Sequence, residues 1–187
     1  MPRCLHPSRI SEQNASLQAV AGDVTDADSV AKVVSGHDVV INSIGPSQPE
    51  DNLNNVVDAA HSLLKGLPDA NVKRLLIVGG AASLEVAPGV LLLDAPEFPA
   101  AWKGIAQAQI DALDVYRTAQ TDVDWTYISP AAFIEPGART GKYRTGNDQL
   151  VVDEKGESRI STEDYAVALL DEVETSKHSR QRFTVAY

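Results

Sequence analysis

The sequence has little cysteine, few aromatic residues and no excess of positive charge, and these shortages exclude several kinds of function. Cys4 is the single cysteine among 187 residues, so no intramolecular disulfide is expected. Sixteen lysines and arginines stand against 26 aspartates and glutamates, a formal charge of −10, which argues against non-specific binding to nucleic-acid phosphates. The four histidines, at positions 6, 37, 61 and 178, share no metal-ligand spacing, so no metal site is predicted.

Long apolar runs are absent too. No stretch approaches the roughly 20 apolar residues that cross a bilayer, and the N-terminal sequence MPRCLHPSRISEQN lacks the apolar centre of a secretory signal. The composition, 43% hydrophobic and 22% charged, is ordinary for a globular domain. We therefore expect a single domain over residues 1–187, located in the cytoplasm and without membrane contact.

Apolar strand patterns alternate with amphipathic helix patterns through residues 1–130. Strands are expected at 17–21, 38–44, 74–78 and 124–129, and helices at 27–34, 50–65 and 100–120. Asp26 is a suitable N-cap for the first helix and Gly36 a suitable stop, while Gly66 and Pro68 are expected to end the second. Because the strands are almost wholly apolar, they favour a doubly wound parallel sheet covered on both faces, the Rossmann class of α/β folds.

The pattern changes after Pro130. The stretches KYRTG, QLVVD and ESRIS look like short strands separated by turns, Ser161 can cap a helix over Tyr165–Val173, and RFTVAY closes the chain as a strand. No repeat or linker sets this part off. Residues 131–187 are therefore expected to form a small substrate-side cap on the domain that residues 1–130 build.

Four segments directly follow the expected strands and form the candidate binding site. In an open parallel sheet, ligands lie beyond the carboxyl ends of the strands. The segments are Asp23–Val24, Asn42–Gly45, Gly79–Ser83 and Pro130–Phe133. Small residues and glycines let a ligand approach the backbone closely, although such segments are also common as plain tight turns.

Several side chains near these segments have two interpretations. Asp23 and Val24 can flank an adenine, or Asp23 can simply begin a helical turn. Ser83 can donate a hydrogen bond to a substrate, or cap a turn. Lys103 can reach a cofactor ribose, or remain an exposed lysine. The aromatic residues can stack on a flat substrate or pack in the core: Phe98, Trp102 and Phe133.

Familiar catalytic motifs are missing. The patterns GxSxG, HExxH and GxxxxGK[ST] do not occur. No tyrosine is followed four residues later by the lysine that assists proton transfer in typical short-chain dehydrogenases. Any reductase chemistry must therefore proceed without that pair.

Five longer motifs together carry a family resemblance. They are GDVTDADSV, DVVINSIG, VGGAASLEVAPG, SPAAFIEPGARTGKYR and GESRISTEDYAVALLDEVE, and they resemble the atypical short-chain dehydrogenase/reductases that include NADH-flavin reductase-like proteins, biliverdin reductase B and NmrA-like proteins. The resemblance covers residues 7–187. It implies a Rossmann fold that binds NAD(P) and passes hydride to a flavin, a quinone or a similar flat conjugated small molecule.

The resemblance also implies roles for the four segments. Asp23 and Val24 would lie around adenine, and Ser43, Ile44 and Gly45 along the adenosine and pyrophosphate. Gly79, Gly80 and Ala81 would lie near nicotinamide, with Pro130, Ala131, Ala132 and Phe133 over its ring. Ser83 and Lys103 are the candidate catalytic residues. Hydride transfer to a flavin mainly needs stacking and exclusion of water, so the missing tyrosine and lysine pair does not exclude it.

The N-terminus departs from the family. Members begin with a strand, a turn of the form TGxTGxxG and a helix, whereas no G-x-G-x-x-G occurs here and Leu5-His6 stand where an arginine is expected. We expect an N-terminally truncated chain that binds NAD(P) weakly, with strand 38–44 exposed at a sheet edge. The alternative is that strand 17–21 repairs the sheet by pairing directly with strand 38–44.

Two other functions are compatible with the same motifs. NmrA-like relatives suggest a regulator that senses NAD(P) without turning it over. An inactive remnant of a longer reductase is the third alternative. No oligomeric state is predicted.

Overall fold

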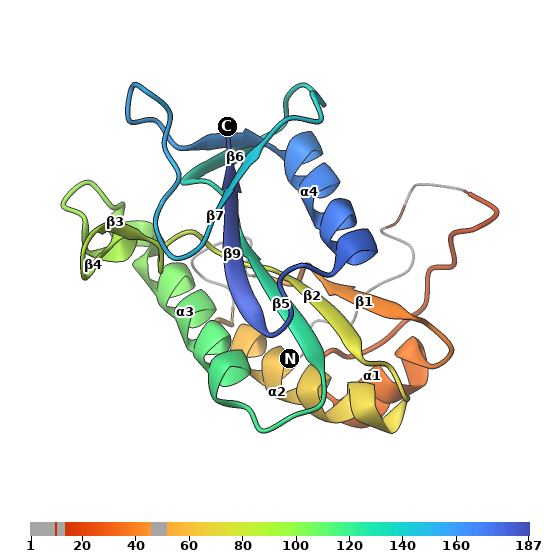
Figure 1. The fold of residues 1–187 in the computed structure, drawn as a ribbon. Coiled ribbons are helices and arrows are strands. Elements are labelled where there is room, and N and C mark those ends of the chain that lie inside the picture. Colours follow the sequence, from red (N-terminus) through yellow and green to blue (C-terminus); the bar gives the residue numbers. More distant parts are fainter. Residues whose placement is uncertain (1–9, 11–13, 46–51) are drawn as a thin grey trace.

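A five-stranded sheet forms the centre of the molecule. The computed structural model, which describes residue 10, residues 14–45 and residues 52–187, orders the strands β1-β2-β5-β9-β7 (Figure 1). Their bounds are Val39–Asn42 (β1), Arg74–Val78 (β2), Asp124–Ser129 (β5), Gln181–Ala186 (β9) and Arg144–Gly146 (β7). The first four strands run parallel, and β7 is antiparallel to β9.

Helices cover both faces of this sheet. Helices α1 (Ala27–Val34), α2 (Asn54–Asp69) and α3 (Lys103–Thr118) lie on one face, and α4 (Thr162–Thr175) lies on the other (Figure 1). This is the doubly wound, Rossmann-like α/β fold that the alternating patterns predict. In the described ranges no helix combines the length and the apolar character that crossing a membrane requires.

Two apolar cores explain why the central strands carry apolar residues on both faces. Leu75 of β2 and Tyr127 of β5 pack into the core beneath α2 and α3. Their neighbours Leu76 and Ile128 point to the opposite face and pack into the core beneath α4. Because successive side chains of a strand alternate between faces, a strand covered on both sides buries the side chains of both faces.

The first helix agrees with its sequence signals, but the second runs past its expected end. Asp26 caps α1 by accepting a hydrogen bond from the Asp28 backbone N–H at 3.1 Å. Gly66 and Pro68 lie inside α2 rather than ending it. A Cβ at Gly66 would lie 2.5 Å from the Ala27 carbonyl oxygen, so this glycine allows α1 and α2 to approach closely. The expectation that Gly66 stops the helix was wrong because the residue serves packing.

The expected strand at residues 17–21 does not form. Residues 17–21 carry no strand pairing, and their side chains are exposed. Strand β1 pairs with β2 and not with this segment. A strand needs a hydrogen-bonding neighbour, and none lies beside residues 17–21 in the described part of the chain. The direct pairing of strands 17–21 and 38–44 was therefore a wrong alternative.

The expected strand QLVVD does not form either. It makes only an isolated bridge, between Gln149 and Glu85.

Strand β1 is an edge strand. Among the described strands it pairs with β2 alone, and the side chain of Ile41 is 44% exposed. The expectation that strand 38–44 lies exposed at a sheet edge is therefore confirmed among the described strands. Its two faces are partly covered, because Val40 packs against the core beneath α2 and α3 and Val39 against the core beneath α4. Its apolar sequence resembles that of the central strands, but the sheet ends beside it.

The C-terminal residues both extend the main sheet and build a small one. Strands β7 and β9 belong to the main sheet, whereas β6 (Phe133–Glu135) pairs in parallel with β8 (Arg159–Ser161). Ser161 caps α4, as predicted, by accepting from the Asp164 backbone N–H at 3.0 Å. The remaining elements are the hairpin of β3 (Glu85–Ala87) and β4 (Val90–Leu91) and the short 3₁₀ helices η2 (Leu92–Asp94) and η3 (Ala100–Trp102).

Candidate functional site

Three of the four candidate segments follow the carboxyl ends of neighbouring parallel strands. Residues 43–45 follow β1, residues 79–83 follow β2, and residues 130–133 follow β5 (Figure 1). Parallel strands end at the same edge of a sheet, so the fold places these segments along one edge. The fourth segment, Asp23–Val24, lies across a pocket from the end of β1.

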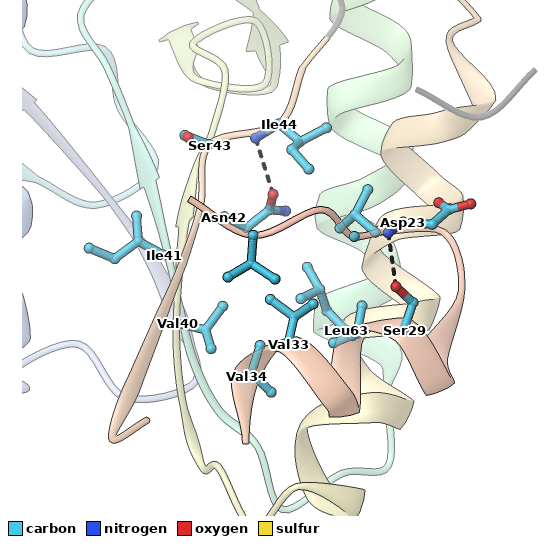
Figure 2. A pocket seen from close by; sticks show the side chains of 14 residues that line it. Asp23, Ser29, Val33, Val34, Val40, Ile41, Asn42, Ser43, Ile44 and Leu63 are labelled. Carbon is cyan, nitrogen blue, oxygen red and sulfur yellow. Dashed lines mark hydrogen bonds between the residues drawn. The ribbon is translucent and has the colours of Figure 1, made fainter. Parts of the chain in front are cut away.

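This pocket has a volume of about 230 Å³ and lies between β1, α1 and residues 20–24 (Figure 2). Its walls are mainly apolar. Figure 2 shows Val33 and Val34 of α1 facing Val40 of β1, with Asp23 across the pocket from Ile44. The pocket thus brings together Asp23 and Val24 with Ser43 and Ile44, two of the four predicted segments.

Asp23 is held by its local turn. Its Oδ1 accepts hydrogen bonds from the backbone N–H of Thr25 at 2.9 Å and from the Thr25 hydroxyl at 2.7 Å. The backbone N–H of Asp23 donates to the Ser29 hydroxyl at 2.9 Å. This geometry is the helix-entry turn that was one interpretation of Asp23. Contact of Asp23 with adenine stays a prediction.

The end of β1 turns sharply around Asn42. The Asn42 side-chain oxygen accepts from the Ile44 backbone N–H at 3.1 Å (Figure 2). Beyond it, a Cβ at Gly45 would lie 3.3 Å from Nε2 of Gln109. Gln109 of α3 therefore stands directly beside the backbone after β1.

Tyr127 and Gln109 connect the segment after β2 to the segment after β1. The Gly80 backbone N–H donates to the Tyr127 hydroxyl at 3.1 Å, and this hydroxyl donates toward Gln109, whose Oε1 lies at 3.2 Å. A Cβ at Gly79 would lie 1.9 Å from the Tyr127 ring, so only glycine fits there. Burial raises the pKa of Tyr127 to about 12, so the hydroxyl stays protonated at neutral pH.

The sequence did not identify Tyr127 or Gln109 as members of the site. Tyr127 lies within the apolar strand pattern of residues 124–129, and Gln109 lies within the helix pattern of residues 100–120. The available signal was the Gly79-Gly80 pair itself, because two glycines after a buried strand indicate that something packs closely against the backbone.

Ser83 lies beside a buried arginine, Arg182. No sequence pattern predicts this contact. Its Oγ accepts a hydrogen bond from Nη1 of Arg182 at 3.1 Å. Nε of Arg182 donates to Oδ1 of Asp148 at 2.9 Å, and Nη2 pairs with the same oxygen. These three residues are distant in the sequence, and the fold of β9 against β5 brings them together.

Lys103, Trp102 and Phe133 are exposed, whereas Phe98 is half-buried. Lys103 is the first residue of α3 and points into solvent, in line with the simpler of its two interpretations. Phe133 is 65% exposed, with the Arg159 guanidinium 5.9 Å from its ring centroid. Trp102 is 46% exposed, so of the two interpretations given for these aromatic residues, packing in the core is wrong for Phe133 and Trp102. Ala131, in contrast, is buried in the core beneath α4.

The described residues fit a dinucleotide in part. The apolar pocket at the end of β1 suits a base. The Cβ positions of Gly79 and Gly80, in contrast, already face Tyr127 and Gln109. The start of α1 carries Asp26 and Asp28, and the start of α4 carries Glu163 and Asp164, so neither favours a phosphate. Helices α2 and α3 have no acidic residue in their first turns. Where the turn before a helix is described, it is not the Gly-rich turn that holds a pyrophosphate. Within the described ranges, no three His, Cys, Asp or Glu side chains gather to hold a metal ion.

Comparison with known proteins gives a consistent match. A family model described as NAD(P)H-binding matches residues 4–173. A Burkholderia pseudomallei structure called a "putative exported protein" is 48% identical, with 92% of this chain and 82% of that chain covered and a TM-score of 0.84. A "putative epimerase" from Bacteroides thetaiotaomicron is 38% identical, covering 97% of this chain and 82% of that chain, with a TM-score of 0.88. A "putative NADH-flavin reductase" from Streptococcus pneumoniae TIGR4 is 32% identical, covering 94% and 83%, with a TM-score of 0.80.

Proposed function

The chain belongs to the NAD(P)H-binding family, and from this premise we propose that it is a reductase that transfers hydride from NAD(P)H to a flavin or a similar flat conjugated molecule. Its cofactor is NAD(P)H, and its role is that of an NAD(P)H-dependent oxidoreductase-like protein. One observation carries the proposal. The segments after β1, β2 and β5 lie along the edge where a parallel sheet binds its ligand, and Gln109 and Tyr127 link the first two.

Each segment has a role in the proposed reaction. Val24 and the apolar walls of the pocket beside β1 hold the adenine, with Asp23 at its rim. The nicotinamide lies beside residues 79–81, because they follow β2 at the ligand-binding edge of the sheet. When bound, NAD(P)H supplies the hydride. Phe133, exposed beside Arg159, offers a flat surface on which a conjugated acceptor can stack.

The first experiment is a titration of NADPH and NADH followed by turnover. Binding is measured by calorimetry, and NAD(P)H oxidation is followed with FMN, FAD and a quinone as acceptors. Gly80→Ala is the informative variant, because its Cβ would lie 3.4 Å from Gln109 and so fits the fold while covering the backbone. We expect weaker NAD(P)H binding by Gly80→Ala and unchanged binding by Lys155→Ala, which changes an exposed turn. Equal binding by both variants would contradict the assigned site.

We further propose that the pyrophosphate contributes little to binding. The proposal is supported by the acidic starts of α1 and α4 and by the negative charge of the whole chain, and it requires that the non-acidic starts of α2 and α3 do not bind the phosphates. Adenosine and ADP are the matched ligands for this test. Similar dissociation constants are expected for the two, whereas ADP binding tenfold or more tightly than adenosine would reveal a phosphate site.

An NAD(P)H sensor is the second candidate function. The exposure of Lys103 favours it, because a solvated lysine is poorly placed for catalysis. Of the two candidate catalytic residues, only Ser83 is then held by a contact within the fold. A sensor would bind NAD(P)H without oxidising it on any acceptor. We propose for either function a cytoplasmic protein with a small-molecule ligand, without nucleic-acid or membrane partners, because the chain is acidic and has a single cysteine.

A further inference from the structure

Arg182 is a buried charge beside the site, and the proposed function as stated does not use it. Its side chain is 3% exposed, and it lies on β9, next to β5. A buried guanidinium is costly unless its N–H groups find acceptors. Here Nε and Nη2 donate to Asp148, while Nη1 donates to Ser83.

The groups around Arg182 hold it in one place. The Asp148 carboxylate also accepts from Nη2 of Arg117 at 3.2 Å. The Asp148 backbone carbonyl accepts from the Glu85 N–H at 2.8 Å, two residues beyond Ser83. The segments that carry Ser83 and Asp148 are thus joined by backbone and by side chain, and Arg182 lies between them.

This contact restricts the direction of the Ser83 hydroxyl hydrogen. A guanidinium has donors and no acceptor, so the Ser83 oxygen must accept from Arg182 and its own hydrogen must point elsewhere. A hydroxyl that accepts from a cation is polarised and becomes a stronger donor. Ser83 follows β2 in the segment where the proposed function places the nicotinamide.

We propose that Arg182 is a positioning residue that holds the Ser83 hydroxyl as a hydrogen-bond donor to the acceptor molecule. The inference rests on the proposed function. The acceptor gains a hydride from NAD(P)H, which leaves as NAD(P)⁺, and a proton from water. Ser83 donates to the acceptor atom that becomes negative as the hydride arrives, and it stabilises that charge more strongly when Arg182 orients it.

The test is a double-mutant cycle of Ser83→Ala and Arg182→Met, with kcat and KM measured for NAD(P)H oxidation. Each single variant is expected to lower kcat by about tenfold or more and to leave the KM for NAD(P)H unchanged. The double variant is expected to be no slower than Ser83→Ala, because Arg182 acts through Ser83. Arg182→Lys keeps one donor and is expected to recover part of the loss.

Arg180→Met is the matched control, since Arg180 precedes β9 and its side chain is exposed. It is expected to turn over as the wild type does. If Arg182→Met does not fold, Asp148→Asn replaces it in the cycle, because this change loosens the anchor of Arg182 while Ser83 is untouched.

The outcomes separate this inference from the function on which it rests. If the wild-type chain fails to oxidise NAD(P)H with any of the acceptors, the proposed reductase and the inference are overturned together. An active wild type with an equally active, folded Arg182→Met overturns only the inference. Losses that multiply in the double variant also overturn it, because they show that the two residues act separately.

Discussion

Glycines in this chain differ in how much space they leave for an added side chain. Gly79 and Gly80 are adjacent, yet a Cβ would lie 1.9 Å from the Tyr127 ring at the first and 3.4 Å from Gln109 at the second. Gly79→Ala is therefore expected to lower the free energy of unfolding by about 2 kcal/mol or more, as overpacking does. Gly80→Ala is expected to cost less than about 1 kcal/mol. Urea denaturation of the two variants compares them directly, and equal losses would contradict the packing argument.

Asp164 gives the chain a defined acid sensitivity. Burial raises the pKa of Asp164, but hydrogen bonds from Thr140, Tyr187 and the Gly141 backbone outweigh it and lower the pKa from 3.8 to about 2. Because the folded-state pKa is below the ordinary value, the carboxylate's contribution to stability is present above pH 4 and is lost as the pH falls toward 2.

Asp164→Asn is therefore expected to be less stable than the wild type at pH 6, with a smaller difference as the pH falls from 4 to 2. Urea midpoints across that range measure the effect. Asp28→Asn is the control, because Asp28 is exposed in the first turn of α1. A constant difference between wild type and Asp164→Asn at all pH values would contradict the assignment.

Residues that act within one turn could be predicted, and residues that act across the fold could not. The caps Asp26 and Ser161 follow from spacing alone, because a cap bonds a backbone N–H two or three residues away. The contact between Ser83 and Arg182 joins positions 99 residues apart. Composition and periodicity carry no information about such a pair.

At the scale of elements, β1 is one of the two edge strands of the sheet. The strand VVIN has no charged residue, pairs on one side among the described strands, and leaves Ile41 44% exposed. Bare edges usually carry lysine or proline to prevent pairing with other chains. Ile41→Lys is therefore expected to reduce concentration-dependent association, which sedimentation velocity measures. Val86→Lys, at a similarly exposed residue of the β3 hairpin, is the control. Equal association by wild type and Ile41→Lys would show that this edge does not mediate it.

The strands that could be predicted are those that are buried on both faces. Arg74–Val78 and Asp124–Ser129 have the bounds that their apolar runs indicate. Residues 17–21 are similar in local sequence but lack a neighbour, so local propensity alone does not make them a strand. Gly66 shows the converse, since a helix continues through a glycine where close packing with α1 requires one.

At the scale of the molecule, a buried network of ion pairs joins α4 to the sheet. It lies at the end of the strands opposite the candidate site. Arg74 and Asp124 are the first residues of β2 and β5. Nη2 of Arg74 lies 2.8 Å from Oε1 of Glu172 on α4, and Oε2 of Glu172 lies 2.7 Å from Nδ1 of His178. The Glu172 side chain is 2% exposed. The network therefore fixes α4 to the sheet without touching the candidate site.

Stability and ligand binding can for this reason be changed separately. Glu172→Gln leaves the Arg74 charge buried with a weaker partner, and breaking a buried pair costs about 3 kcal/mol. We expect a free energy of unfolding lower by about that amount in urea denaturation. We also expect an unchanged NAD(P)H dissociation constant at a temperature where both proteins are folded. Gly80→Ala should behave in the opposite way, with nearly wild-type stability and weaker binding. If Glu172→Gln weakened binding as well, the two ends of the sheet would be coupled, and the site would depend on how α4 is held.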